Sequence, residues 1–409
     1  MKKKNTTDIL IIGGGAAGLA LALIVAETGI SVNVVDPHKP ASFAKTTPSG
    51  RTVALMNSSL NILGETNIWP RMEPLSAALR VMRIIDDSVP ALAPVTSDFD
   101  SGAIGLAQYG FNLPAGHLRA ALYEEAEKRK NITLHVPAKL DNYTDNGAFL
   151  TATLEGGKQI NARLLVGADG RGSRVREIAG IKTWSKKYDQ SAITCLINHS
   201  RSHDNIAHEF HRSGGPLALV PLPGNQSSVV WVEKSGKAKD LMALSETAFT
   251  AALQEASNNV LGGLTLETPA EIWPLGALRA KELTRPRMAL MAEAAHAMSP
   301  ITAQGLNLSL RDVAALAESI ADARRLGLDI GAASVLENYE RRRNVDIRTR
   351  MAGVDGMNTL VSSDILGVKQ IRRAGLLALD KLTPLKNFAM EQGLAPPIDK
   401  GRLARGERL

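Results

Sequence analysis

Cysteine is almost absent from this chain of 409 residues, and aromatic residues make up only 4% of it. The single thiol, Cys195, cannot form an internal disulfide, and its apolar surroundings predict a buried core residue. No group of cysteines and histidines has metal-ligand spacing, and neither a Walker loop nor a zinc signature occurs. The scarce aromatics are not interleaved with basic residues, which argues against single-stranded nucleic-acid binding. These absences predict a cytoplasmic protein with no metal and no nucleic-acid partner.

A membrane anchor is the next class that the sequence disfavours. The uncharged run from Ile9 to Ala26 follows three lysines and imitates a signal peptide or a membrane span. However, Asp8 precedes the run and glycines 13–15 interrupt it. No other segment has the length and apolarity to span a bilayer, so we expect a soluble protein.

The overall composition is that of a globular enzyme, with 44% hydrophobic and 22% charged residues. The length predicts two or three domains. The formal net charge of +7 could favour an anionic partner, such as a phosphate-bearing cofactor, a membrane surface or a nucleic acid. Because the excess is modest for this length, we interpret it as a solubility feature.

A glycine loop near the start carries the first functional signal. A buried-type strand at 8–12, a helix at 19–27 and a second strand at 31–35 form a βαβ pattern around residues 13–18, which read Gly-Gly-Gly-Ala-Ala-Gly. In such a loop the first glycine permits the turn, the second lets a pyrophosphate approach the backbone, and the third packs helix against strand. An acid after the second strand can bind a ribose. The candidate cofactor-binding residues here are Gly13, Gly15, Ala16, Ala17, Gly18 and Asp36. The pattern does not separate FAD from NAD.

Two later motifs favour a flavin. The strand at 164–166 precedes Asp169-Gly170, and the strand at 288–291 precedes Glu293, an acid that can bind ribityl hydroxyls. A loop and a long helix follow, and the helix N-terminus can stabilise the negative charge of reduced flavin near N1 and C2. The residues expected against the flavin are Pro300, Ala303, Gln304, Gly305, Leu306 and Asn307. No side chain is assigned as a nucleophile or base, since the flavin carries the chemistry.

With these motifs the chain resembles the class A FAD-dependent monooxygenases, and within them the ubiquinone-biosynthesis hydroxylase group. Further matching segments are 49–55, 117–122, 188–192, 215–222 and 300–312. The resemblance implies that Arg51, Arg119 and Asp169 contact FAD, and that Asp169 is also linked to the nicotinamide donor. One departure stands out: the family usually has Gly-Asp where this chain has Ala292-Glu293.

The resemblance also implies an activity. NAD(P)H would reduce the flavin transiently, O2 would form a flavin C4a-hydroperoxide, and the aromatic ring of a polyprenylated phenol would be hydroxylated in ubiquinone biosynthesis. Two alternatives remain open: a class A hydroxylase of another aromatic substrate, and a flavin-bearing scaffold subunit of a biosynthetic complex. The prenyl tail implies an apolar channel. It also leaves room for complex partners or for peripheral contact with the inner membrane.

The expected fold is α/β: a Rossmann-like FAD-binding domain of the aromatic hydroxylase type, a smaller, mostly antiparallel β-sheet substrate domain, and C-terminal helices. We assign 1–70, 105–182 and 284–345 to the discontinuous FAD-binding domain, 71–104 and 183–283 to the substrate domain, and 346–409 to the C-terminal helical segment. Residues 132–165 are expected to form a β-meander. The ligand should lie between the domains.

Three further features have competing interpretations. His296 could be a base, although a structural residue beside the flavin loop is the preferred interpretation. Arg341–Arg343, Arg348 and Arg350 could bind anions, but we expect a solvated helix face. Residues 365–390 mix aliphatic and basic residues, which fits either an amphipathic docking surface or ordinary packing against the FAD domain.

Overall fold

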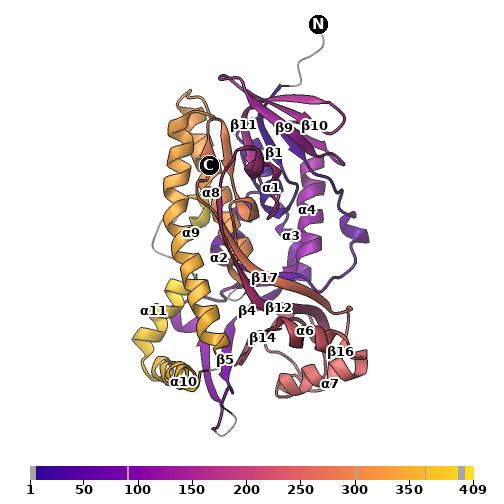
Figure 1. Ribbon diagram of the computed structural model, residues 1–409, viewed down its shortest axis with the longest axis vertical. Coiled ribbons are helices and arrows are strands. Elements are labelled where there is room, and N and C mark those ends of the chain that lie inside the picture. Colours follow the sequence, from indigo (N-terminus) through magenta and orange to yellow (C-terminus); the bar gives the residue numbers. More distant parts are fainter. Residues whose placement is uncertain (1–5, 90–91, 301–302, 364, 395–400) are drawn as a thin grey trace.

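The computed structural model describes residues 6–89, 92–300, 303–363, 365–394 and 401–409. Figure 1 shows two sheets stacked along the long axis: the first, which contains β1 (Thr6–Ile12), lies at one end, and the largest, which contains β12 (Thr183–His199), lies at the other. A long helix, α9 (Ala333–Ser362), runs down one side and spans both. None of the described helices is both long enough and apolar enough to cross a bilayer.

The first sheet has the parallel core that the βαβ pattern predicts. Its main path runs β18-β19-β11-β1-β2-β8, and every pair from β19 to β8 is parallel. The strands are β1 (Thr6–Ile12), β2 (Val32–Val35), β8 (Ile132–His135), β9 (Leu140–Asp145), β10 (Leu150–Leu154), β11 (Gln159–Gly167), β18 (Thr284–Arg285) and β19 (Met288–Leu290). The aliphatic side chains on both faces of the central strands are buried, as is usual in a parallel sheet.

The expected meander across 132–165 is wrong at its first strand. β8 pairs with β2 in parallel, and only β9, β10 and β11 form an antiparallel meander. The physical reason is the preceding helix α4 (Ala115–Glu127), which acts as a crossover and returns the chain in the parallel direction.

Helix α1 (Ala16–Ala26) fills the space beside this sheet. It begins at Ala16, three residues earlier than the pattern predicted, and is buried nearly all round. It packs against α4 and against α8 (Gln304–Arg325), so it has no solvated face and carries no charge.

The largest sheet is mostly antiparallel, as expected. Nine described strands form it, and only β13 and β5 pair in parallel. They are β5 (Val81–Asp86), β6 (Val95–Asp100), β12 (Thr183–His199), β13 (Ile206–Arg212), β14 (Gly215–Leu222), β15 (Gln226–Lys234), β16 (Leu264–Leu266), β17 (Glu271–Ala280) and β20 (His296–Ala297). Helices α6 (Ser235–Met242) and α7 (Glu246–Ala256) contribute to the apolar core on one face, where Cys195 is fully buried, which confirms the core-thiol prediction.

A small sheet packs against β14 of the large sheet and against helices α4 and α8. It contains β3 (Thr52–Met56), β7 (Gly110–Pro114) and β4 (Ala77–Leu79), with α2 (Asn57–Gly64) and α3 (Trp69–Met72) nearby. After α9 the chain continues in α10 (Leu366–Lys381) and α11 (Thr383–Leu394), so the predicted helical C-terminal region is confirmed. The remaining short elements are α5 (Arg174–Ile178), η1 (Phe43–Lys45), η2 (Glu73–Leu75), η3 (Ser101–Ile104), η4 (Ala292–Ala294) and η6 (Leu403–Arg405).

The division of the chain into domains stays a prediction. The sheets draw on broadly the stretches assigned to each domain. β20, however, joins the large sheet from within the stretch assigned to the FAD-binding domain.

Candidate functional site

Three motifs that lie far apart in the sequence meet at one edge of the parallel sheet. Ile12 at the end of β1 pairs with Gly167 at the end of β11, and Gly167 pairs with Leu290 at the end of β19. The glycine loop, Asp169-Gly170 and Ala292-Glu293 follow these three strand ends directly. Ligands of open α/β sheets bind outside the carboxyl ends of the strands, so this edge is the candidate site.

The glycines of the loop have the geometry that their predicted roles require. Gly13 adopts φ +116°, and a Cβ there would lie 2.2 Å from the carbonyl oxygen of Ala168. A Cβ on Gly18 would lie 2.1 Å from the carbonyl oxygen of Gly13, so helix and strand pack too closely for any other residue. In contrast, a Cβ on Gly15 would meet no atom within 4 Å. Open space therefore borders the N-terminus of α1, where an anion would be stabilised.

Asp36 and Arg119 form a connected pair at this end of the site. Asp36 accepts hydrogen bonds from the backbone N–H of Gly14 (2.7 Å) and from Arg119 (2.9 Å). The Arg119 Nε also donates to the carbonyl oxygen of Gly14 at 2.8 Å. Arg119 therefore positions the acid and the loop together, while its FAD contact stays a prediction.

Asp169 organises the second loop. Its carboxylate accepts from the Ser173 hydroxyl at 2.5 Å and from the backbone N–H groups of Arg174 and Val175. Ser173 in turn caps α5 by accepting from the Arg176 N–H at 3.0 Å. The Asp169 carboxylate therefore stabilises the second loop, and this loop places the turn at Gly170 at the sheet edge.

The third strand end holds the departure from the family pattern. Ala292 adopts φ +54°, the left-handed region that glycine occupies without cost. The next residue, Glu293, is exposed, and its carboxylate lies 3.2 Å from the Nε of Arg171 in the second loop. Glutamate is therefore held at the edge between two motifs, where a polyol chain could reach it.

The N-terminus of α8 is tied to the small sheet by Asn307. Its Oδ1 accepts from the Met56 N–H and the Ser59 hydroxyl, and its Nδ2 donates to the carbonyl oxygens of Ala54 and Ala303. All four hydrogen bonds lie between 2.7 and 2.9 Å. Both polar atoms of the Asn307 side chain are therefore engaged in hydrogen bonds within the protein, so any contact of Asn307 with flavin must come from its backbone.

The rest of this helix start leaves room for a ligand. Gly305 is exposed, and a Cβ there would meet no atom within 4 Å. Ala303 adopts φ +51° and is exposed, as is Pro300, whereas Leu306 is half-buried. Gln304 is buried and its Oε1 accepts from Arg350 at 3.1 Å. Ala303 and Gly305 are thus exposed at the start of α8, and their contact with a flavin stays a prediction.

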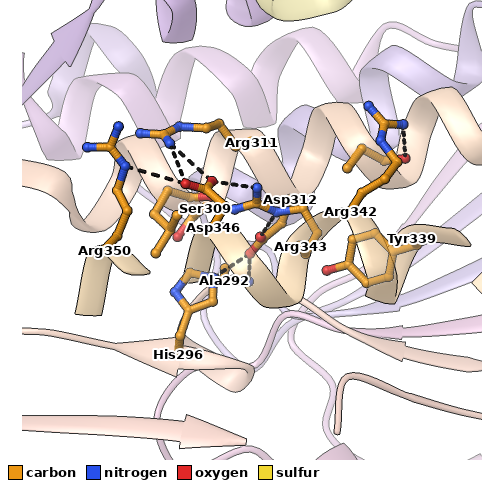
Figure 2. Close-up of polar contacts among 12 residues, drawn as sticks. Ala292, His296, Ser309, Arg311, Asp312, Tyr339, Arg342, Arg343, Asp346 and Arg350 are labelled. Carbon is orange, nitrogen blue, oxygen red and sulfur yellow. Dashed lines mark hydrogen bonds and ion pairs between the residues drawn. The ribbon is translucent and has the colours of Figure 1, made fainter. Parts of the chain in front are cut away.

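Behind this surface lies a buried ionic network (Figure 2). Asp312 Oδ2 lies 2.6 Å from His296 Nε2 and accepts from the Ala292 N–H at 2.9 Å. Its Oδ1 accepts from Arg343 Nε at 2.7 Å, and Arg343 also bonds Asp346 at 2.6 Å. One carboxylate therefore holds the turn that carries Glu293, helix α8 and helix α9 in a fixed arrangement.

The expected solvated face for the arginines of α9 is wrong at two positions. Arg343 is buried, and Arg350 is nearly so, with its Nε 3.5 Å from Asp346. Arg311 of α8 bonds the same Asp346 carboxylate at 3.0 Å. These arginines are structural ion-pair partners between two helices. The sequence held one signal for these pairs: Asp312 lies in an otherwise largely apolar stretch. A buried carboxylate there would need a cationic partner, because an unpaired buried charge is strongly destabilising.

The network keeps its acids ionised. Burial by itself would raise the pKa of Asp312, but the charges and hydrogen bonds of His296 and Arg343 outweigh it, and the pKa lies below its usual value. The Nε2 atom of His296 is hydrogen-bonded to Asp312, which favours a structural role for His296 over that of a base.

Arg51 immediately precedes β3. Its guanidinium sits over the ring of Trp273 in β17, 5.0 Å from the ring centroid. The contact bridges the small sheet and the large sheet. Its expected contact with FAD stays a prediction.

These features fit FAD when taken together. An open helix N-terminus for phosphates, an acid for the ribose and an acid for the ribityl chain lie along one sheet edge, and an exposed helix start lies behind them. Along this edge Asp36 follows β2, the glycine loop follows β1 and Glu293 follows β19. This order matches that of the ribose, the pyrophosphate and the ribityl chain along FAD.

The comparisons with known proteins agree with this geometry. Residues 6–351 match the FAD binding domain family. The ubiquinone hydroxylase UbiL of Rhodospirillum rubrum is 35% identical over 95% of this chain and 90% of its own. The 3-demethoxyubiquinol 3-hydroxylase of Escherichia coli is 29% identical over 95% of this chain and 98% of its own.

A solved structure supports the fold. The p-nitrophenol 4-monooxygenase PnpA of Pseudomonas putida superimposes with a TM-score of 0.77 at 18% identity, covering 96% of this chain and 99% of its own. The chain therefore belongs to the class A FAD-dependent monooxygenases, in the ubiquinone-biosynthesis hydroxylase group.

Proposed function

We propose that this protein uses FAD, NAD(P)H and O2 to hydroxylate the aromatic ring of a polyprenylated phenol in ubiquinone biosynthesis. The observation that carries the proposal is the likeness, over 95% of the chain, to relatives named as hydroxylases of ubiquinone and demethoxyubiquinol. We propose peripheral contact with a membrane as part of this function, because such a substrate partitions into lipid.

FAD, when bound, supplies the redox chemistry, and the chain supplies placement and charge. The N-terminal N–H groups of α8, at Gly305 and Leu306, would stabilise negative charge on the reduced ring. Asn307 fixes that helix start through four hydrogen bonds, and Glu293 would hold the ribityl chain. Asp36 would bind the ribose.

An apolar cluster beside this site supports a substrate with an apolar tail. We call it the Tyr109 cluster: Met56, Leu79, Tyr109 and Met390 are buried together between the small sheet and the large one. The half-buried residues packed on it are Ala54, Met82, Phe99, Ile104, Ala207 and Val220. The N–H of Met56 donates to Asn307, so the cluster adjoins the start of α8.

The Tyr109 hydroxyl fits a phenolic ring. It is buried within this apolar cluster and has no hydrogen-bond partner among the described residues, although such a group normally finds one. Burial raises the pKa of Tyr109 well above its usual value, so it stays a neutral donor. A substrate oxygen would satisfy it.

The test is to purify the protein, record its visible spectrum, and follow NAD(P)H oxidation and hydroxylated product with and without a prenylated phenol. Bound flavin with product formation that depends on the phenol supports the proposal. Turnover on a water-soluble phenol alone would favour another aromatic substrate. Bound flavin with only peroxide release, and normal complex assembly by a variant without FAD, would favour the scaffold alternative. A colourless protein that FAD cannot reconstitute would overturn the proposal.

A further inference from the structure

A long segment of irregular backbone joins two of the residues expected to contact FAD, Asp36 after β2 and Arg51 before β3. We call residues 37–49 the β2–β3 loop. The structure describes all of them, and their only regular element is the three-residue η1. None of them is buried. Loops of this length without secondary structure are uncommon in compact domains, and many of them are lids or binding loops.

Helix α4 contacts both ends of the β2–β3 loop. Near the first end, Arg119 donates to the carbonyl oxygen of His38 at 2.7 Å. Near the other end, Thr46 packs on the first turn of the helix, where a Cβ added to Gly116 would lie 3.2 Å from the Thr46 methyl group. The loop therefore lies along the helix and does not project into solvent.

Glu124 of α4 holds the middle of the loop. Its Oε1 accepts from the backbone N–H of Phe43 at 2.7 Å, and its Oε2 accepts from Arg71 of α3 at 2.6 Å. The Arg71 guanidinium lies over the Phe43 ring, 4.3 Å from its centroid. The His117 ring meets the same ring edge-on, with 5.2 Å between centroids. One carboxylate thus fixes the backbone of Phe43 directly and its side chain through Arg71.

The Glu124 contacts matter more for the loop than for the whole fold. The N–H of Phe43, followed by Arg71, holds the pKa of Glu124 below its usual value, so the hydrogen bonds are made to an ionised group. The side chains of Arg71 and Glu124 are 31% and 28% exposed, so water partly screens the pair. Global stability should therefore depend little on it. A loop that buries no residue of its own, however, opens locally unless such contacts hold it.

The ends of the loop are anchored to the walls of the candidate site. The guanidinium of Arg119 that holds the first end also bonds the Asp36 carboxylate at 2.9 Å. Beyond the other end, Gly50 approaches β12 so closely that a Cβ there would lie 2.8 Å from the Cα of Cys195. Movement of the loop is therefore limited to its middle, where Glu124 holds it.

We infer that the β2–β3 loop is a lid over bound FAD and that Glu124 is the positioning residue that holds this lid closed. FAD enters and leaves when the middle of the loop separates from α4, so Glu124 controls the rate of FAD dissociation without touching the cofactor. The inference rests on the proposed FAD contacts of Asp36 and Arg51, and it does not depend on which aromatic substrate is hydroxylated.

The experiment measures the exchange of labelled FAD. The full-length holoenzyme is loaded with radiolabelled FAD and chased with excess unlabelled FAD, and the label retained after rapid desalting is followed with time. The test variant is Glu124→Ala, which removes both hydrogen bonds and keeps a good helix former. The matched control is Glu125→Ala on the same helix, because Glu125 pairs with Lys128 and Arg129 and not with the loop.

A second pair of samples tests the opposite change. Thr46→Cys with Gly116→Cys places two thiols where the loop packs on α4, and the native Cys195 is buried away from oxidants. Thiol titration verifies that the disulfide has formed. A disulfide that holds the lid closed should slow FAD release, whereas a general loss of stability cannot slow it.

Glu124→Ala should release FAD about tenfold faster than wild type, while Glu125→Ala matches wild type and both keep the wild-type melting temperature within a few degrees. The oxidised double-cysteine variant should release FAD about tenfold more slowly than its reduced form. Equal release by the two alanine variants, or equal release by the oxidised and reduced forms, overturns the inference. A wild-type protein that binds no FAD would instead count against the proposed function.

Discussion

Asp312 Oδ2 lies 2.6 Å from His296 Nε2, with both side chains fully buried. Since the pKa of Asp312 is lowered and its carboxylate accepts, His296 must carry its proton on Nε2. The same oxygen accepts from the Ala292 N–H at 2.9 Å, so one carboxylate holds both ends of the turn that carries Glu293 (Figure 2). The ribityl-binding position proposed for Glu293 therefore depends on a residue that need not touch FAD.

Asp312→Asn tests this dependence. The change leaves Arg343 buried with one of its two carboxylates lost, and we expect the free energy of unfolding to fall by about 3 kcal/mol or more. FAD affinity, measured by flavin fluorescence on titration, should fall with it because the turn is freed. Asp322→Asn on the same helix is the control: its carboxylate is half-exposed, so less than about 1 kcal/mol should be lost. Unchanged FAD affinity in Asp312→Asn would separate the network from the site.

The sequence predicted the outline of the site because its signals are local. Strand, glycine turn and helix follow each other between residues 8 and 27, so the open space at Gly15 could be expected without a structure. The meeting of three loops at one edge follows from parallel pairing of β1, β11 and β19. Parallel strands must present their carboxyl ends together.

What the sequence could not reveal depends on long-range partners. Arg343 looked like part of a solvated basic run because its partner, Asp312, lies 31 residues away on another helix. The inward direction of Arg372 depends on Asp86, which is 286 residues away. Charge patterns within one helix do not distinguish a solvated charge from a paired, buried one.

Ala292→Gly should stabilise the protein. Alanine at φ +54° costs about 1–2 kcal/mol, and the greater freedom of glycine in the unfolded chain returns about 0.4–1 of that. The net gain in unfolding free energy should be near 0.5–1 kcal/mol, measured by urea unfolding. Ala294→Gly, in the same short helix but fully buried and without positive φ, should be destabilising. If both changes destabilise, the backbone at 292 is not strained.

Tyr109→Phe should separate stability from substrate binding. Removing a buried hydroxyl without a partner should leave the unfolding free energy unchanged or raise it by about 1 kcal/mol. If the hydroxyl donates to the phenol, KM should rise about tenfold with kcat less affected, since a hydrogen bond made in both substrate and transition state is lost. Tyr143→Phe in β9 is the control and should leave KM unchanged. An unaltered KM in Tyr109→Phe would move the ring site elsewhere.

His208 should make the protein less stable in mild acid. It is buried in β13, and burial, reinforced by the charge of Arg83, lowers its pKa from 6.5 to about 4. The unfolded chain therefore binds a proton between pH 6.5 and 4 that the folded chain refuses, so stability falls as pH falls through this window. The loss is at most about 3 kcal/mol.

Urea unfolding of wild type and His208→Gln at pH 7, 6, 5 and 4 measures this contribution. Carboxylates with lowered pKa, such as Asp86 and Asp312, lose their stabilising contribution progressively as the pH falls below about 5. That loss is common to wild type and the variant, so the difference between the two profiles isolates His208. His208→Gln should therefore lose less stability than wild type between pH 6.5 and 4, whatever its stability at pH 7. Parallel pH profiles for the two proteins would mean that His208 takes up its proton in the folded state as readily as in the unfolded chain.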